Sequence, residues 1–267
     1  MRIGVFDSGV GGLSVLKKIK EKINFADVIY YGDSLHSPYG NKTIEQIQKY
    51  SLDIGQFLMD NMVDVIVIAC NTATAAALDK MREKFTSIPI IGVVEPGAIT
   101  AVKKTKNKKI GVISTPLTAK SGVYKKEIKK INPRIDVFLQ GCEKLCPMIE
   151  GEWSSTEEET NILRSYIEEL PKDIDTLILG CTHYPLIIED IKNIFDGIIV
   201  DPAEETAMST LFELNKIALR KGIIKRRQEM NIDYFVTGDL EKFKKIGEKF
   251  MGEKIKNIYQ PLVNEYE

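Results

Sequence analysis

A strand-turn-helix pattern built around one cysteine constrains this chain more than any other feature. Residues 65–69 are apolar and mostly β-branched, Cys70 follows them, and residues 71–78 are small, polar and rich in alanine. Such a run is typical of a buried strand that turns into a helix. Cys70 would then lie at the carboxyl end of a strand and at the positive end of a helix. We therefore expect a thiol whose pKa is lowered toward the thiolate form.

The same pattern occurs a second time around Cys181. Residues 176–180 form an apolar run that ends in glycine, and Cys181 is followed by the polar residues Thr182 and His183. The chain has four cysteines in all. Two of them in equivalent positions indicate a paired design rather than chance.

Short apolar runs alternate with helical patterns along most of the chain, which predicts an α/β fold with parallel sheets. Ligands of such sheets bind beyond the carboxyl ends of the strands, where Asp7, Asp33, Cys70 and Glu95 would lie. We expect strands at or within residues 2–6, 28–31, 65–69, 88–94, 109–116, 136–139, 176–180, 197–202 and 233–237. We expect helices from about residue 13, then over 43–62, 71–85, 157–170, 206–221 and 240–250, with a turn at 95–97.

The order of these elements predicts two similar parallel-sheet α/β domains that face each other across a central cleft. The first domain would comprise residues 1–97 and 207–267 and carry Cys70. The second would comprise residues 98–206 and carry Cys181. The second half is complete before residue 207, so the last part of the chain is expected to return to the first.

Composition excludes several classes of function. The chain has 267 residues with 37 Lys and Arg against 38 Asp and Glu, so its net charge of −1 does not favour a nucleic-acid partner. Neither a signal peptide nor a membrane-spanning run is apparent, and we expect a cytoplasmic protein with reduced cysteines. Cys142 and Cys146 are interpreted as structural, because only two histidines accompany the four cysteines. We therefore expect no metal site.

Two cysteines on opposing domain edges admit three kinds of chemistry. A redox pair normally lies within one turn as C-x-x-C, and the spacing here is far longer. A cysteine hydrolase needs one nucleophile and a histidine, which leaves the second cysteine without a role. A pair of acid/base thiols gives both cysteines a role, because one removes a proton from carbon while the other returns a proton to the opposite face. The third interpretation predicts racemisation or epimerisation without a cofactor.

Four motifs also carry a family resemblance. In chain order they resemble those of the glutamate racemases of the aspartate/glutamate racemase family, at residues 6–13, 32–33 with 38–40, 69–73 and 180–186. The resemblance implies interconversion of L-glutamate and D-glutamate for peptidoglycan, without pyridoxal phosphate or metal. It also implies that Cys70 acts on the D-enantiomer and Cys181 on the L-enantiomer. We further expect a homodimer.

The resemblance also assigns roles to the other motif residues. Asp7 and His183 would tune the two thiols. Asp33 and Glu150 would lie behind the residues that contact the substrate and support them. Glu95 receives no catalytic role. The substrate would be held by Asp7, Ser8, Tyr39, Gly40, Asn71, Thr72, Thr182 and His183. No arginine stands in any of these motifs, so hydroxyls, backbone N–H groups and helix ends would stabilise the two carboxylates of glutamate.

Three other functions remain open at this point. An aspartate racemase would use two thiols in a similar frame. A non-catalytic amino-acid-binding module would not need both Cys70 and Cys181. A zinc protein would need more ligands than the spacing of the cysteines and histidines supplies.

Overall fold

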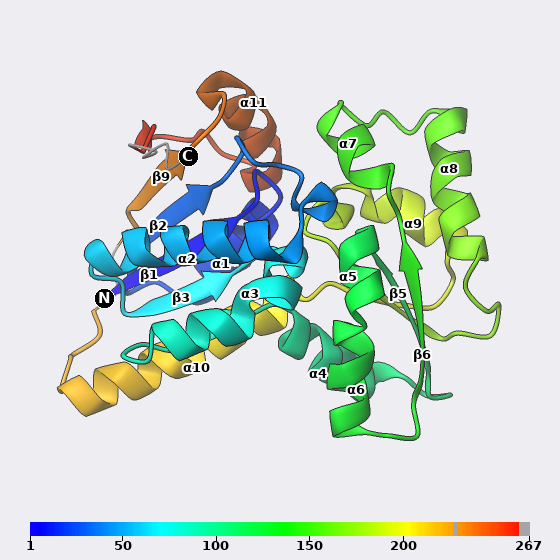
Figure 1. The fold of residues 1–267 in the computed structure, drawn as a ribbon, viewed down its shortest axis with the longest axis horizontal. Helices are drawn as coiled ribbons and strands as arrows, with labels where there is room; N and C mark the ends of the chain where they lie inside the picture. The colour runs from blue at the N-terminus through cyan, green and yellow to red at the C-terminus, as the bar shows by residue number, and fades with distance from the viewer. Residues whose placement is uncertain (227–228, 262–267) are drawn as a thin grey trace.

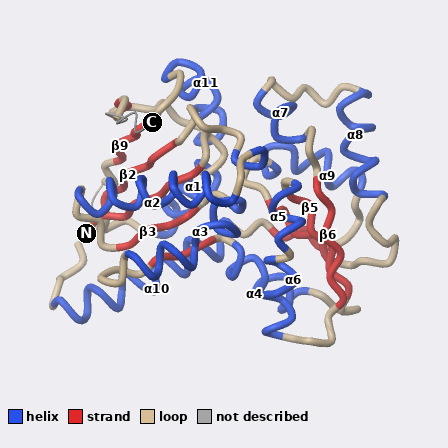
Figure 2. Tube along the Cα trace, in the orientation of Figure 1, coloured by secondary structure: helices blue, strands red, loops and turns tan. Residues whose placement is uncertain are grey.

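The strands of the described residues form two separate parallel sheets, as predicted. The computed structural model describes residues 1–226 and 229–261. Its first sheet has the order β10-β9-β2-β1-β3-β4 and its second the order β6-β5-β7-β8. Figures 1 and 2 show the two sheets apart from each other. The first comprises β1 (Arg2–Asp7), β2 (Asp27–Gly32), β3 (Val65–Ile68), β4 (Ile90–Gly92), β9 (Ile232–Val236) and β10 (Ile258–Tyr259). The second comprises β5 (Lys109–Ser114), β6 (Asp136–Gly141), β7 (Thr176–Gly180) and β8 (Ile198–Val200).

Helices cover both sheets and make the chain an α/β protein of two parts that lie side by side in Figure 1. The first part carries α1 (Leu13–Lys22), the short η1 (Tyr39–Asn41), α2 (Ile44–Asp60), α3 (Asn71–Lys84), α10 (Ala203–Lys221) and α11 (Leu240–Met251). The second carries α4 (Val94–Lys104), α5 (Pro116–Ser121), α6 (Val123–Ile131), α7 (Leu145–Glu150), α8 (Glu157–Glu168), η2 (Tyr184–Ile187) and α9 (Ile188–Ile194). Among the described residues, no helix combines the length and apolarity that crossing a membrane requires.

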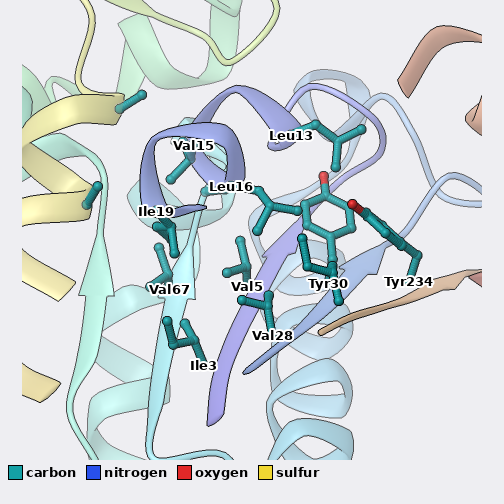
Figure 3. Packing of buried hydrophobic residues seen from close by; sticks show 14 of the residues in the cluster. Ile3, Val5, Leu13, Val15, Leu16, Ile19, Val28, Tyr30, Val67 and Tyr234 are labelled. Carbon is teal, nitrogen blue, oxygen red and sulfur yellow. The ribbon is translucent and has the colours of Figure 1, made fainter. Parts of the chain in front are cut away.

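The central strands are buried on both faces, which explains their almost unbroken apolar sequences. Side chains alternate along a strand, so Ile3 and Val5 pack under α1 while Phe6 packs on the opposite face with α2 and α3. Figure 3 shows Leu13, Leu16 and Ile19 of α1 lying over the first of these faces. Each fully buried aliphatic side chain stabilises the fold by ~1.5–3 kcal/mol. The carboxyl ends of these strands, where the polar residues of the predicted site follow, are therefore held by a rigid core.

The end of the chain adds strands to the first sheet. Residues 232–236 of β9 pair in parallel with residues 28–32 of β2, and β10 pairs with β9. This sheet membership agrees with a first domain made of residues 1–97 and 207–267, although the two boundaries stay predictions. Residues 262–267 of that range lie outside the described residues.

Two predicted elements differ from the structure. Glu95, Pro96 and Gly97 do not form a turn, because they lie in the first turn of α4 after a strand of only Ile90–Gly92. Proline is compatible with a first helical turn, where its missing N–H would have no partner. Helix α10 begins at Ala203 rather than at residue 206, with the Asp201 carboxylate accepting the Ala203 N–H.

Candidate active site

A small cavity lies where the carboxyl ends of the two sheets meet, and most of the predicted site residues line it. Its volume is about 110 Å³, far below the several hundred Å³ typical of pockets for drug-sized ligands. It is lined by Ser8, Ser37, Pro38, Tyr39, Gly40, Cys70, Asn71, Thr72, Thr115, Cys146, Pro147, Glu150, Cys181, Thr182 and His183. A larger hollow of about 800 Å³ between α3, α4 and α10 contains none of the predicted site residues.

Cys70 caps the N-terminus of α3 and faces this cavity. Its Sγ accepts the Ala73 N–H at 3.4 Å, and its thiol lies 3.7 Å from Ser8 Oγ. The predicted lowering of its pKa is wrong. Burial, reinforced by the nearby Asp7 carboxylate, raises the pKa of Cys70 to about 12, although the Ala73 N–H and Ser8 act in the opposite direction. Desolvation of a buried thiolate outweighs the helix end here.

Cys181 occupies the equivalent turn after β7. Its Sγ lies 3.2 Å from the Sγ of Cys146 and 3.7 Å from Nδ1 of His183. The Cys146 contact and burial raise the pKa of Cys181 well above its ordinary value, and His183 opposes them. Both predicted cysteines are thus buried thiols of high pKa, which become strong bases once deprotonated.

His183 joins Cys181 to a carboxylate on the far side of its ring. Its Nε2 lies 2.9 Å from Oε1 of Glu150, and its Nδ1 faces Cys181. Burial by itself would lower the pKa of His183, but the hydrogen bonds to Cys181 and Glu150 raise it well above its ordinary range. His183 in turn lowers the pKa of Glu150 against the effect of burial. The structure therefore brings Glu150, His183 and Cys181 into one chain of contacts.

Asp7 lies at the end of β1, where the two parts of the molecule touch. Its carboxylate accepts the Gly9 N–H at 3.1 Å and the Thr182 hydroxyl at 3.5 Å. Complete burial raises the pKa of Asp7, although the His183 charge opposes this. A Cβ added at Gly11 would overlap the Thr182 hydroxyl and lie 2.7 Å from Nδ1 of His183. The absence of a side chain at Gly11 thus lets the turn after β1 pack on the turn after β7.

Neutral hydrogen-bonding groups surround the remainder of the cavity. Thr72 contacts Thr115 and Thr118 through hydroxyl oxygens 2.9 and 3.3 Å apart, and the Tyr124 hydroxyl donates to Oδ1 of Asn71 at 2.6 Å. Each of these contacts joins α3 of the first part to the second part, at α5, at Thr115 directly before it, or at α6. None of the described residues that line the cavity is a lysine or an arginine.

Asp33 lies behind the cavity rather than in its lining. Its carboxylate accepts the Tyr39 hydroxyl at 2.6 Å and the Thr237 hydroxyl at 2.9 Å, and it lies 2.8 Å from Nδ1 of His36. These bonds tie the loop that carries Tyr39 and Gly40 to the end of β9. Asp33 therefore has the geometry of a group that positions Tyr39.

Sequence reasoning missed part of this lining. Thr115 follows β5, and the signal for it was available because it ends a run with the same plan as residues 2–8. Cys146 was interpreted only as a core residue. It is buried, but it also lines the cavity and contacts Cys181. Nothing in its C-x-x-x-C spacing indicates that α7 would place it there.

Comparisons with known proteins agree with this arrangement. The model of the Asp/Glu/hydantoin racemase family matches residues 3–210. Glutamate racemases of Fusobacterium nucleatum and Geobacter metallireducens are 43% and 41% identical over 97% of this chain, covering 97% and 95% of their own lengths. The crystal structure of glutamate racemase from Francisella tularensis in complex with D-glutamate superposes with a TM-score of 0.90 at 33% identity, covering 99% of this chain and 98% of that one.

A glutamate racemase isoform from Bacillus anthracis is similar to the same degree, with a TM-score of 0.89, 38% identity and coverage of 97% of this chain and 96% of that one. Aspartate racemase from Picrophilus torridus shares the fold alone, at 20% identity. The chain is therefore an isomerase that belongs to the Asp/Glu/hydantoin racemase family and, within it, to the glutamate racemases.

Proposed function

We propose that this enzyme interconverts L-glutamate and D-glutamate with Cys70 and Cys181 as its two acid/base groups. One observation carries the proposal. Cysteines at equivalent turns of two different sheets line one small cavity. The relatives named above are glutamate racemases, and one of them was crystallised with D-glutamate, which supports glutamate over aspartate as the substrate.

In the direction from D to L, the Cys70 thiolate would take the proton from Cα while the Cys181 thiol gives its proton to the opposite face. The reverse direction exchanges these roles. The electron pair left at Cα spreads into the adjacent carboxylate, and hydrogen-bond donors aimed at that group stabilise it. Ser8, Thr72 and Thr182 are among the donors that line the cavity, and the N–H groups that begin α3 lie beside them.

The high pKa of both thiols suits this chemistry. A Cα–H is a very weak acid, so a base of high pKa removes its proton more readily than a base of low pKa. We assign Asp7 to assist Cys70, and His183, held by Glu150, to assist Cys181. Tyr39, Gly40 and Asn71 would hold the remainder of the substrate.

The biological setting belongs to the same proposal. D-glutamate would serve peptidoglycan synthesis, the enzyme would act in the cytoplasm as a homodimer, and the reaction would need neither metal nor pyridoxal phosphate. Activity should therefore survive a chelator and disappear on thiol alkylation. Inhibition by a chelator that added zinc reverses would contradict this part.

Circular dichroism of L-glutamate and of D-glutamate with added enzyme tests the reaction directly. Both signals should decay to zero, while Cys70→Ser and Cys181→Ser should racemise almost nothing. Cys142→Ser is the matched control, because Cys142 is equally buried but does not line the cavity. Decay with aspartate but not with glutamate would favour an aspartate racemase. No decay with either amino acid would leave a binding module.

A further inference from the structure

Three atoms of the kind that bind metal ions converge at one side of the cavity. The sulfurs of Cys146 and Cys181 and one ring nitrogen of His183 all lie within 4.8 Å of one another. All three side chains are buried, with exposed fractions of 8%, 6% and 5%. They come from α7 and from the turn after β7, which both belong to the second part of the molecule. The cluster therefore exists without any contribution from the first part.

The spacing is close to that of a tetrahedral metal centre. Two sulfurs bound at ~2.3 Å to one tetrahedral zinc ion lie roughly 3.8 Å apart, and a sulfur and a bound nitrogen lie slightly closer. The sulfurs are 3.2 Å apart here, and Cys181 Sγ is 3.7 Å from Nδ1 of His183. Binding of one ion would therefore require the two sulfurs to move about 0.6 Å farther apart. Two thiolates and one imidazole are a donor set that zinc accepts readily.

The surroundings of His183 also match those of a metal ligand. Histidines that bind a metal through one ring nitrogen commonly donate the other N–H to a carboxylate, which fixes the ring and its tautomer. Nε2 of His183 lies 2.9 Å from Oε1 of Glu150, which leaves Nδ1 directed at Cys181. The fourth position of the tetrahedron would face the cavity that the same three residues line.

We propose that this cluster is an inhibitory site for a thiophilic divalent cation, represented by Zn²⁺. The cation binds Sγ of Cys146, Sγ of Cys181 and Nδ1 of His183, with water as the fourth ligand, and both thiols release their protons to solvent. A metal-bound thiolate carries no proton to give to Cα and is a much weaker base than a free thiolate, so the metal-bound enzyme is inactive. Metal binding is independent of the proposed function, whereas inhibition rests on it.

Direct binding measurements test the site without reference to activity. Full-length protein without a histidine tag, kept reduced, is titrated with Zn²⁺ by calorimetry and with Cd²⁺ by sulfur-to-metal charge-transfer absorption. We expect one ion per chain. Loss of a group that only hydrogen-bonds to a metal ligand weakens metal binding by about 10- to 100-fold. Cys146→Ala removes a ligand itself, so it should weaken binding by roughly tenfold or more. Cys142→Ala, the matched control from the same segment, should bind as the unmodified protein does.

Protection from alkylation provides a measurement that needs no variant. With saturating Zn²⁺, iodoacetamide should modify Cys146 and Cys181 several-fold more slowly, while the rate at Cys70 stays unchanged. Mass spectrometry of the peptides reports each site separately. Equal rates with and without Zn²⁺ at Cys146 and Cys181 would overturn the proposal, as would unchanged affinity in a folded Cys146→Ala protein.

The racemase assay then separates the two proposals. Zn²⁺ should abolish the decay of the glutamate circular dichroism signal, excess chelator should restore it, and Cys146→Ala should need roughly tenfold more Zn²⁺ for the same inhibition. Equal sensitivity of Cys146→Ala and the unmodified enzyme would overturn the inhibitory role. If the ion binds as expected but the metal-free enzyme racemises nothing, the proposed function fails and the metal site stands.

Discussion

Replacing Glu150 by glutamine should lower the pKa of His183 and leave most of the site in place. Glutamine keeps the shape of the side chain but removes the charge that lies 2.9 Å from Nε2. A hydrogen bond to a charged group contributes ~1.5–3 kcal/mol, and one pKa unit corresponds to about 1.36 kcal/mol. The Glu150 side chain is 26% exposed, so solvent screening favours the lower end. We expect the pKa of His183 to fall by about one unit.

The same change should destabilise the protein in a defined pH window. The folded-state pKa of His183 is raised, so its stabilising effect is fully present below the unfolded value of about 6.5 and disappears as the pH rises through the folded value. The folded-state pKa of Glu150 is lowered. The stabilisation that Glu150 contributes is therefore fully present above its unfolded-state pKa of about 4.5 and disappears as the pH falls through its folded-state pKa. The stability difference between unmodified protein and Glu150→Gln should therefore be largest between about pH 4.5 and 6.5.

Nuclear magnetic resonance of the histidine ring protons measures this pKa directly. The chain has two histidines, and His36 contacts Asp33 rather than Glu150, so its signal is an internal reference. Glu152→Gln is the matched control, because exposed Glu152 pairs with Lys245 at the surface and not with His183. An unchanged His183 midpoint in Glu150→Gln would refute the coupling on which our assignment of Glu150 depends.

Three further predictions concern Asp7, the two thiols and Gly11. Asp7→Asn should raise the thermal midpoint at pH 7 while activity falls, because burial raises the pKa of the carboxyl and its charged form opposes folding. A gain of about 1 kcal/mol would appear as a rise of roughly 2–4 °C in the thermal midpoint. The gain should vanish below pH 3.8, where the carboxyl is protonated in the folded and the unfolded chain. In heavy water, early product should carry deuterium at Cα and recovered substrate little, while Cys70→Ser blocks proton removal from D-glutamate and Cys181→Ser from L-glutamate. Gly11→Ala should lower the free energy of unfolding in urea by ~1–3 kcal/mol, because its Cβ meets Thr182 and His183.

Each of these predictions has a contrary result. A thermal midpoint of Asp7→Asn that falls at pH 7 would mean that the charged carboxylate stabilises the fold. Deuterium that enters substrate and product equally fast from the start would indicate a single base that serves both faces. Gly9→Ala is the control for Gly11→Ala, because its Cβ would meet nothing nearer than 3.5 Å; equal losses in the two variants would remove the packing argument.

Much of the fold follows from patterns that act over short stretches of chain. Apolar runs that end in small polar residues predict buried parallel strands, and they predicted the positions of Cys70 and Cys181 correctly because a strand-helix turn is local. The resemblance of four motifs to glutamate racemases named the family. The predicted turn at residues 95–97 is wrong, because a proline is equally compatible with a turn and with the first turn of a helix.

The tertiary structure decided everything that depends on contacts between distant segments. Neither the approach of Gly11 to His183 nor that of Cys146 to Cys181 leaves a pattern in the chain, because the partners are 172 and 35 positions apart. The pKa values also depend on contacts between distant segments. A helix N-terminus can be predicted from local sequence and lowers a thiol pKa, but the loss of solvent that raises it depends on how the two parts of the molecule close around Cys70.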